Sequence, residues 1–156
     1  MATFVEVIDH LKATADSLPN INTVFFGNSE DVDIKRMSNY PLLHIVPENA
    51  SLSGSATRLS FNIHLMDIVD FNTEDIQDTN EPFKGTDNLQ YVLSECLQQL
   101  SMFADLLRRG PDRHNYLLET EPTLTPFLDS YENKLAGWST MLTITIKGSP
   151  TTDGIC

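Results

Sequence analysis

One amphipathic segment constrains the fold more than any other part of the chain. Between residues 87 and 108, apolar side chains recur at the three- and four-residue spacing of a single helix face. They are Leu89, Val92, Leu93, Cys96, Leu97, Leu100, Phe103 and Leu107. Thr86 stands where it can cap the start, and the Arg108–Pro111 run RRGP is typical of a helix end. A helix with one such stripe has to pack on a second layer of structure.

A second helix is predicted over residues 4–18, where apolar residues again recur at helical spacing. They are Phe4, Val7, Ile8, Leu11, Ala15 and Leu18. Thr3 and Glu6 have the spacing of a capping box, in which hydroxyl and carboxylate each satisfy a free backbone N–H. Pro19 and Asn20 end this helix.

The layer that the helices cover is predicted to be a β-sheet. Its strands are expected near 23–27, 40–47, 57–69, 123–130 and 137–147. Strand 40–47 (YPLLHIVP) is almost wholly apolar, as in a central strand, whereas 57–69 alternates apolar and polar residues, as in a half-buried antiparallel strand. These two strands are predicted to form a hairpin with an extended tip. The tip, residues 48–56, is rich in small residues and is predicted to be a mobile connection.

Strands that follow one another through short links favour an antiparallel sheet with both helices packed on one face, which is the α+β class. Residues 1–156 are expected to form a single α+β domain with a flexible C-terminal tail at 149–156. The residues predicted to pack together in the core are Leu93, Leu97, Leu100, Phe61, Ile63, Leu142 and Ile144. Trp138, the only tryptophan, is either a core residue or a partly exposed interface anchor.

The charge of the chain excludes some partners. Ten basic against 22 acidic residues give a net charge of −12, which repels phosphate and argues against duplex binding through a basic patch. It does not exclude DNA that passes nearby. No apolar run approaches the roughly 20 residues needed to span a bilayer, and residues 1–12 lack a secretory signal. Two cysteines, Cys96 and Cys156, cannot build a disulfide framework, so a reducing cytoplasm is expected.

The sequence contains no motif that identifies a catalytic site. The phosphate loop, the dinucleotide-binding motif, the nucleophile elbow, H-E-x-x-H and C-x-x-C are all absent. Four histidines are scattered along the chain: His10, His44, His64 and His114. His44 and His64 lie on the two paired strands with Asp67 near, but a metal site would lack its third and fourth ligands. We therefore expect two polar histidines on the outer face of the sheet.

The acidic stretch after residue 67 invites a cation-binding interpretation. An EF-hand loop needs oxygen ligands in a fixed register around a glycine, and Ile76 occupies the glycine position here. We expect residues 70–85 to form a solvated acidic loop instead. No pair among the 22 carboxylates stands out as an acid–base pair. The prediction is therefore no catalytic, cofactor-binding or metal-ligating residue, no cofactor, and no enzyme.

The order of elements resembles that of the tail-terminator (tail-completion) and head–tail neck or connector proteins of tailed bacteriophages. The hairpin opening YPLLHIVP and the closing block LAGWSTMLTITIKG (135–148), with its short tail to Cys156, carry the likeness. The resemblance covers most of the chain. It implies a structural virion protein that is assembled in the host cytoplasm as a homo-oligomeric ring, with six copies expected. Adjacent neck or tail proteins would be its partners, and DNA would pass through the lumen without sequence-specific binding.

In such a ring, the hairpin tip (48–56), the acidic loop (70–85) and the C-terminal tail would reach neighbouring subunits, because they hold few apolar residues of their own. Two other hypotheses stay open. One is a monomeric cytosolic ligand- or peptide-binding module of ferredoxin-like type. The other is a small hydrolase that uses His64 and nearby acids. Oligomeric state separates the first two, and activity screens with metal analysis address the third.

Overall fold

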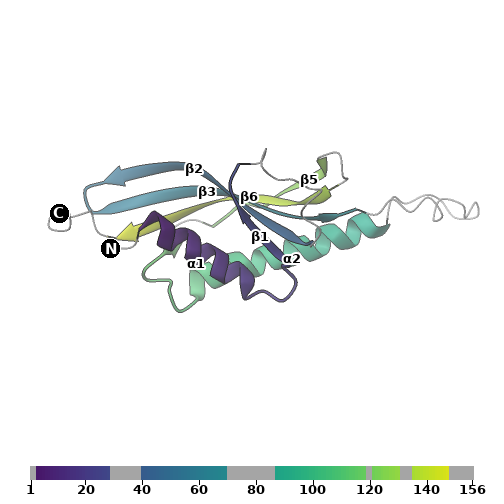
Figure 1. Cartoon of the computed structure of the whole chain (residues 1–156), viewed down its shortest axis with the longest axis horizontal. Helices are drawn as coiled ribbons and strands as arrows, with labels where there is room; N and C mark the ends of the chain where they lie inside the picture. Colours follow the sequence, from purple (N-terminus) through teal and green to yellow (C-terminus); the bar gives the residue numbers. More distant parts are fainter. Residues whose placement is uncertain (1–2, 29–39, 70–86, 119–120, 131–134, 148–156) are drawn as a thin grey trace, which may run out of the picture.

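The computed structural model describes residues 3–28, 40–69, 87–118, 121–130 and 135–147. The elements in chain order are α1 (Phe4–Asp16), β1 (Thr23–Phe26), β2 (Leu42–Ser53), β3 (Ala56–Ile68), α2 (Asp87–Arg109), β4 (Leu117–Leu118), β5 (Thr125–Ser130) and β6 (Leu135–Lys147). Both helices lie on one side of the sheet (Figure 1). The predicted α+β class is confirmed. Thr86, the acidic loop 70–85 and the tail 149–156 lie outside the described residues.

The sheet has the strand order β1-β2-β3-β6-β4, and β5 also pairs with β6. β1 runs parallel to β2, with Thr23 opposite Leu42 and Phe26 opposite Ile45, while the remaining pairs are antiparallel. The prediction of a wholly antiparallel sheet is therefore wrong at this edge. The connection from Gly27 to Pro41 is long enough for the return crossover that a parallel pair requires.

The β2–β3 hairpin is longer and tighter than predicted. Pairing runs from Leu42 opposite Met66 to Ser53 opposite Ala56, with one irregularity between Pro47 and Asn49. Residues 48–53, predicted to be a mobile connection, instead continue β2. Their small polar side chains favour loops, but the register of β3 supplies a paired backbone that overrides this preference.

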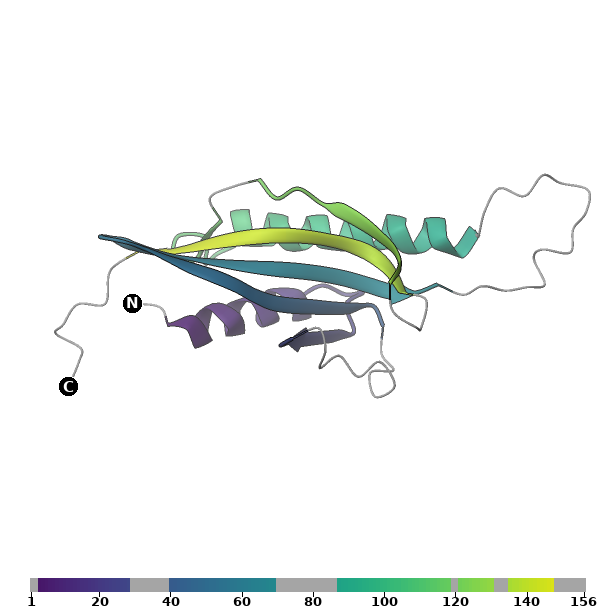
Figure 2. The same cartoon turned by 90° about the horizontal axis from the view of Figure 1, so that it is seen from above.

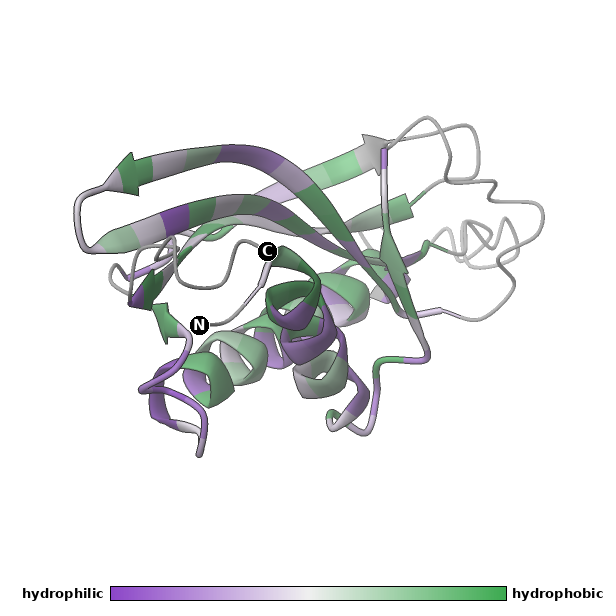
Figure 3. Cartoon of the chain, turned by 60° about the vertical axis from the view of Figure 1, so that its left-hand side comes forward, coloured by the Kyte–Doolittle hydropathy of each residue, from purple (hydrophilic) through white to green (hydrophobic). Residues whose placement is uncertain are grey.

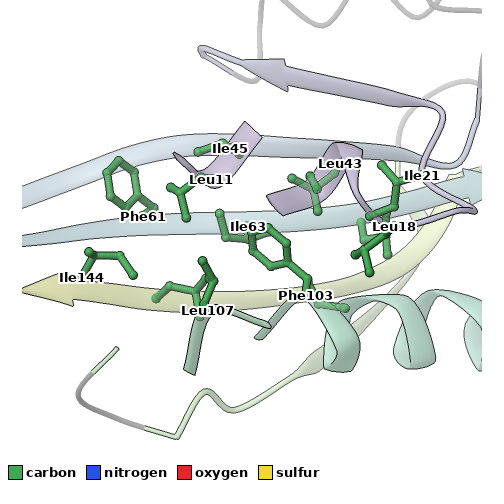
Figure 4. Close-up of a cluster of buried hydrophobic side chains, with 14 of the residues drawn as sticks. Leu11, Leu18, Ile21, Leu43, Ile45, Phe61, Ile63, Phe103, Leu107 and Ile144 are labelled. Atoms are coloured by element: carbon green, nitrogen blue, oxygen red, sulfur yellow. The ribbon is translucent and has the colours of Figure 1, made fainter. Parts of the chain in front are cut away.

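The core lies between the sheet and the helices. In Figure 4, Leu11 of α1, Ile45 of β2, Ile63 of β3 and Phe103 of α2 point into one cluster, and all four side chains are fully buried. The predicted capping box starts α1, since the Thr3 amide donates to Glu6 Oε2 at 2.6 Å and the Glu6 amide donates to Thr3 Oγ1 at 3.2 Å. Figure 3 shows that neither helix covers the opposite side of the sheet.

Most of the predicted core is confirmed, with one error. Five of the seven predicted residues are buried, namely Leu100, Phe61, Ile63, Leu142 and Ile144. Leu93 is partly buried and packs against this cluster, whereas Leu97 is 36% exposed. Each residue turns the helix by about 100°, so the stripe centred on Cys96 and Leu100 leaves Leu97 on the flank. Leu97 is therefore not a core residue.

The closing strand is attached to α2 and to β3. The Trp138 indole N–H donates to the Leu93 carbonyl oxygen at 2.8 Å, and its ring packs against the core. Next to it, a Cβ on Gly137 would lie 1.8 Å from the Leu65 carbonyl oxygen, so only glycine allows this approach to β3. β3 and β6 curve together along the sheet in Figure 2. Trp138 is thus a partly buried core residue on the helix side of the sheet.

Candidate functional site

The two histidines singled out in the sequence face each other across β2 and β3. His44 is directly opposite His64, which is directly opposite Ser139 of β6. The imidazole centroids of His44 and His64 lie 5.8 Å apart. The three side chains therefore form one row, which we name the histidine row, on the side of the sheet that the helices leave uncovered.

His44 lies on the outer face of the sheet, as expected, but its side chain is fully buried there, at 0% exposure. Its Nε2 lies 2.8 Å from the Gly27 carbonyl oxygen, to which it donates, and the Phe25 ring centroid lies 5.3 Å away. Its Nδ1 is buried and has no hydrogen-bond partner among the described residues. Burial lowers the pKa of His44, and the bond to Gly27 opposes this shift. The bond to the Gly27 carbonyl oxygen requires that Nε2 carries a proton.

His64 is half-buried and bonded to a residue that sequence reasoning did not single out. Its Nδ1 lies 2.6 Å from Ser139 Oγ, and Phe127 of β5 approaches its ring edge-on at 6.3 Å. Burial lowers the pKa of His64, the nearby His44 lowers it further, and Glu48 raises it. The alternation of Trp138, Leu142 and Ile144 already assigns Ser139 to the other face of β6, but only the strand register places it beside His64.

Asp67 does not join this row. It is opposite Ala136, which packs in the core on the helix side of the sheet, whereas the histidine row lies on the other side. Its Oδ1 accepts the amide of Ile68 at 2.7 Å. Burial raises the pKa of Asp67, with a smaller opposing effect of that hydrogen bond and a further rise from Glu95. The predicted neighbourhood of His44, His64 and Asp67 is therefore not assembled.

The described contacts of the histidine row are contacts between side chains of neighbouring strands. Ser139 lies in the middle of a paired strand, and its hydroxyl forms a hydrogen bond with Nδ1 of His64 on the adjacent strand. No carboxylate of the described residues is hydrogen-bonded to His64. Among the described residues, no group of three or more His, Cys, Asp or Glu side chains could hold a metal ion. The row is a line of polar side chains that joins β2, β3 and β6.

A small hydrophobic cluster borders the histidine row. Leu42, Met66 and Leu135 are buried there, with Tyr40 and Phe127 packed against them. The Tyr40 hydroxyl is buried, and no described residue forms a hydrogen bond with it. Burial, and then the charge of Asp67, raise its pKa. This end of the uncovered side is therefore a second, minor core.

The opposite end of the sheet has a different character. β2 pairs with β1 only through Leu42–Ile45, and every residue from Pro47 to Ser53 is exposed. No strand within the described ranges pairs with the outer edge of β2 beyond Ile45. Leu52, in this segment, is 79% exposed. We name the outer edge of residues 48–53 the open β2 edge. It is the strongest candidate for a functional surface.

Of the three segments predicted to contact neighbours, the structure describes one. The hairpin tip 48–56 contains the open β2 edge and its turn, whereas the acidic loop 70–85 and the tail 149–156 lie outside the described residues. Neither helix within the described ranges is long and apolar enough to cross a membrane.

Comparisons with known proteins add no relative. No protein-family model matches the chain, and no curated protein matches its sequence.

Proposed function

We propose that this chain is a non-catalytic structural subunit of a ring at the neck or tail end of a tailed bacteriophage. In this ring, six copies surround a lumen through which DNA passes. Neighbouring neck or tail proteins bind its two rims. The proposal rests on the order of elements that resembles tail-terminator and connector proteins, and on one feature of the fold.

That feature is the open β2 edge. A strand edge with unpaired N–H and C=O groups is a template for another chain, and monomeric proteins usually block such edges with charge, proline or a covering element. Here Glu48 is the only charged residue in the segment, and its carboxylate accepts a hydrogen bond from the Asn62 side chain. The edge is therefore suited to pairing between subunits.

The charge of the chain is compatible with a DNA passage. A net charge of −12 disfavours retention of phosphate, whereas a basic lining would bind the genome through counterion release. We accordingly expect no measurable binding of the ring to duplex DNA at physiological salt.

Light scattering of the full-length protein, alone and mixed with its neck or tail partners, tests the proposal together with mass spectrometry of purified virions. A ring in solution and a stoichiometric virion component are expected. A protein that stays monomeric in every mixture and is absent from virions would contradict it. The open β2 edge would then favour the peptide-binding module, since an extended peptide can add to such an edge.

A further inference from the structure

We propose that the open β2 edge binds the C-terminal segment, residues 148–156, of a second copy of this chain as an added strand. The inference rests on the proposed ring for the presence of a second copy. It adds the surface, the occupant and the direction of the subunit contact. Residues 148–156 lie outside the described structure, and the described chain ends at Lys147 of β6.

The backbone of the open β2 edge is paired with β3 on its inner side. Asn49 to Ser53 pair with Ser60 to Ala56 of β3 on the inner side of β2, so the backbone groups pointing the other way have no strand partner within the described ranges. Six residues of strand are about 20 Å long. An added strand would satisfy these groups in the way that peptides do when they augment a sheet.

Apolar side chains lie on the helix side of the sheet at this edge. Leu52 is opposite Thr57, which shares one side of β3 with the core residues Leu59 and Phe61, so Leu52 lies on the helix side of the sheet. On that side Phe4 stacks on Phe61, with ring centroids 6.1 Å apart.

Phe4 also meets Phe26, at the end of β1, edge-on at 6.2 Å. It remains 45% exposed, and its neighbour Val5 is 64% exposed. The open edge is therefore bordered by apolar surface at the start of α1, which an incoming apolar side chain could cover.

The end of β6 lies at the tip of the hairpin. β6 ends with Lys147 opposite Ala56, which is itself opposite Ser53, so the chain leaves the sheet at the tip of the hairpin. β6 runs in the same direction as β2, because both are antiparallel to β3. At Lys147 the described chain therefore points beyond the tip, away from the β2 edge of its own copy. A segment that continues in this direction would meet another copy before its own edge.

The length and composition of this segment fit the edge of a neighbour. Nine extended residues span about 30 Å, which is enough to leave one subunit and pair along six residues of the next. Thr151 and Thr152 are β-branched, which favours an extended strand, and Ile155 is apolar. Because the tail and the edge are different patches, the contact is head-to-tail and closes into a ring when the rotation allows it.

Disulfide trapping tests this arrangement in the full-length protein. In a Leu52→Cys variant, the new thiol at the edge and the native Cys156 are expected to join under mild oxidation by a copper–phenanthroline complex. Each copy then links to two neighbours, so a non-reducing gel should show a ladder of covalent species up to the number of subunits in the ring. Met141→Cys is the matched control, because Met141 is also an exposed apolar strand residue but lies on the opposite side of the sheet.

The ladder should disappear when Cys156→Ser is combined with Leu52→Cys. Dimers that survive in this double variant would show two edges pairing with each other and overturn the tail as occupant. A faster-migrating monomer without a ladder would place the tail on its own edge and overturn the exchange between copies.

Light scattering of the same samples separates this inference from the proposed function. A ring without a ladder overturns the strand addition and leaves the ring standing. Neither a ring nor a ladder overturns both. As a second variant, Leu52→Glu should abolish assembly at concentrations where the wild type and Met141→Glu both assemble, and its far-UV circular dichroism should match that of the wild type.

Discussion

The two halves of β2 show how one strand serves two purposes. Leu42–Ile45 have β1 on one side and β3 on the other, and all four side chains are buried. Within the described ranges Pro47–Ser53 have β3 alone as a neighbour, and all seven side chains are exposed. The first half supports the fold of the subunit. The second half contributes little to that fold, and it is the part that we propose pairs with another chain.

Truncation of one apolar residue in each half should give the largest contrast. Ile45→Ala removes a fully buried side chain and should lower the free energy of unfolding by about 2–5 kcal/mol. Leu52→Ala should change it by less than about 0.5 kcal/mol, since that side chain is 79% exposed. Urea unfolding of the dilute protein measures both. Equal losses would mean that the two halves of β2 do not differ as described.

Trp138→Phe should give an intermediate effect in the covered region. Phenylalanine keeps most of the apolar contact but leaves the Leu93 carbonyl without its indole donor, which should cost about 1–3 kcal/mol. Thermal unfolding provides the measurement, and Tyr91→Phe, at an exposed site on α2, is the control. A Trp138→Phe variant as stable as the wild type would show that the bond does not tie β6 to α2.

The histidine row predicts a dependence of stability on pH. Burial lowers the pKa values of His44 and His64 in the folded protein below about 6.5, the ordinary value in the unfolded chain. The unfolded state then binds more protons, so these groups contribute their full stability above about pH 6.5 and lose it as the pH falls below that value. Urea unfolding at several pH values measures the slope. His64→Gln should make it shallower, and an unchanged slope would contradict this assignment.

Leu97→Ala should have the smallest effect, below about 1 kcal/mol, because more than a third of the side chain is already in water. Cys96→Ala, one residue away and buried, should cost more. Guanidinium unfolding compares the two variants. A larger loss of unfolding free energy for Leu97→Ala than for Cys96→Ala would mean that Leu97 is a core residue, as the sequence predicts.

The types of element could be predicted because periodicity reports on burial. Both helices and the strands β1, β2, β3, β5 and β6 follow from their apolar patterns, as does most of the core. Leu97 could not be separated from its neighbours, since Leu93 and Leu97 form a second apolar ridge beside the one that faces the sheet. The two-residue strand β4 is too short to have a pattern of its own.

Features that depend on pairing were harder to predict. The parallel direction of β1 leaves no trace in its four residues. The burial of His44 was implicit in the apolar run YPLLHIVP, because a strand covered on both sides hides its polar residue as well. Ser139 became a partner of His64 only through the register of β3 and β6. The open β2 edge was missed because small polar residues resemble a loop until a partner strand is seen beside them.

The mass of the full-length protein in solution tests the central claim most directly. Native mass spectrometry should detect a closed assembly of six 17.5-kDa chains, about 105 kDa, and Leu52→Glu should reduce it to single chains. A protein that remains a 17.5-kDa monomer at every concentration, with or without its neck or tail partners, would contradict the ring.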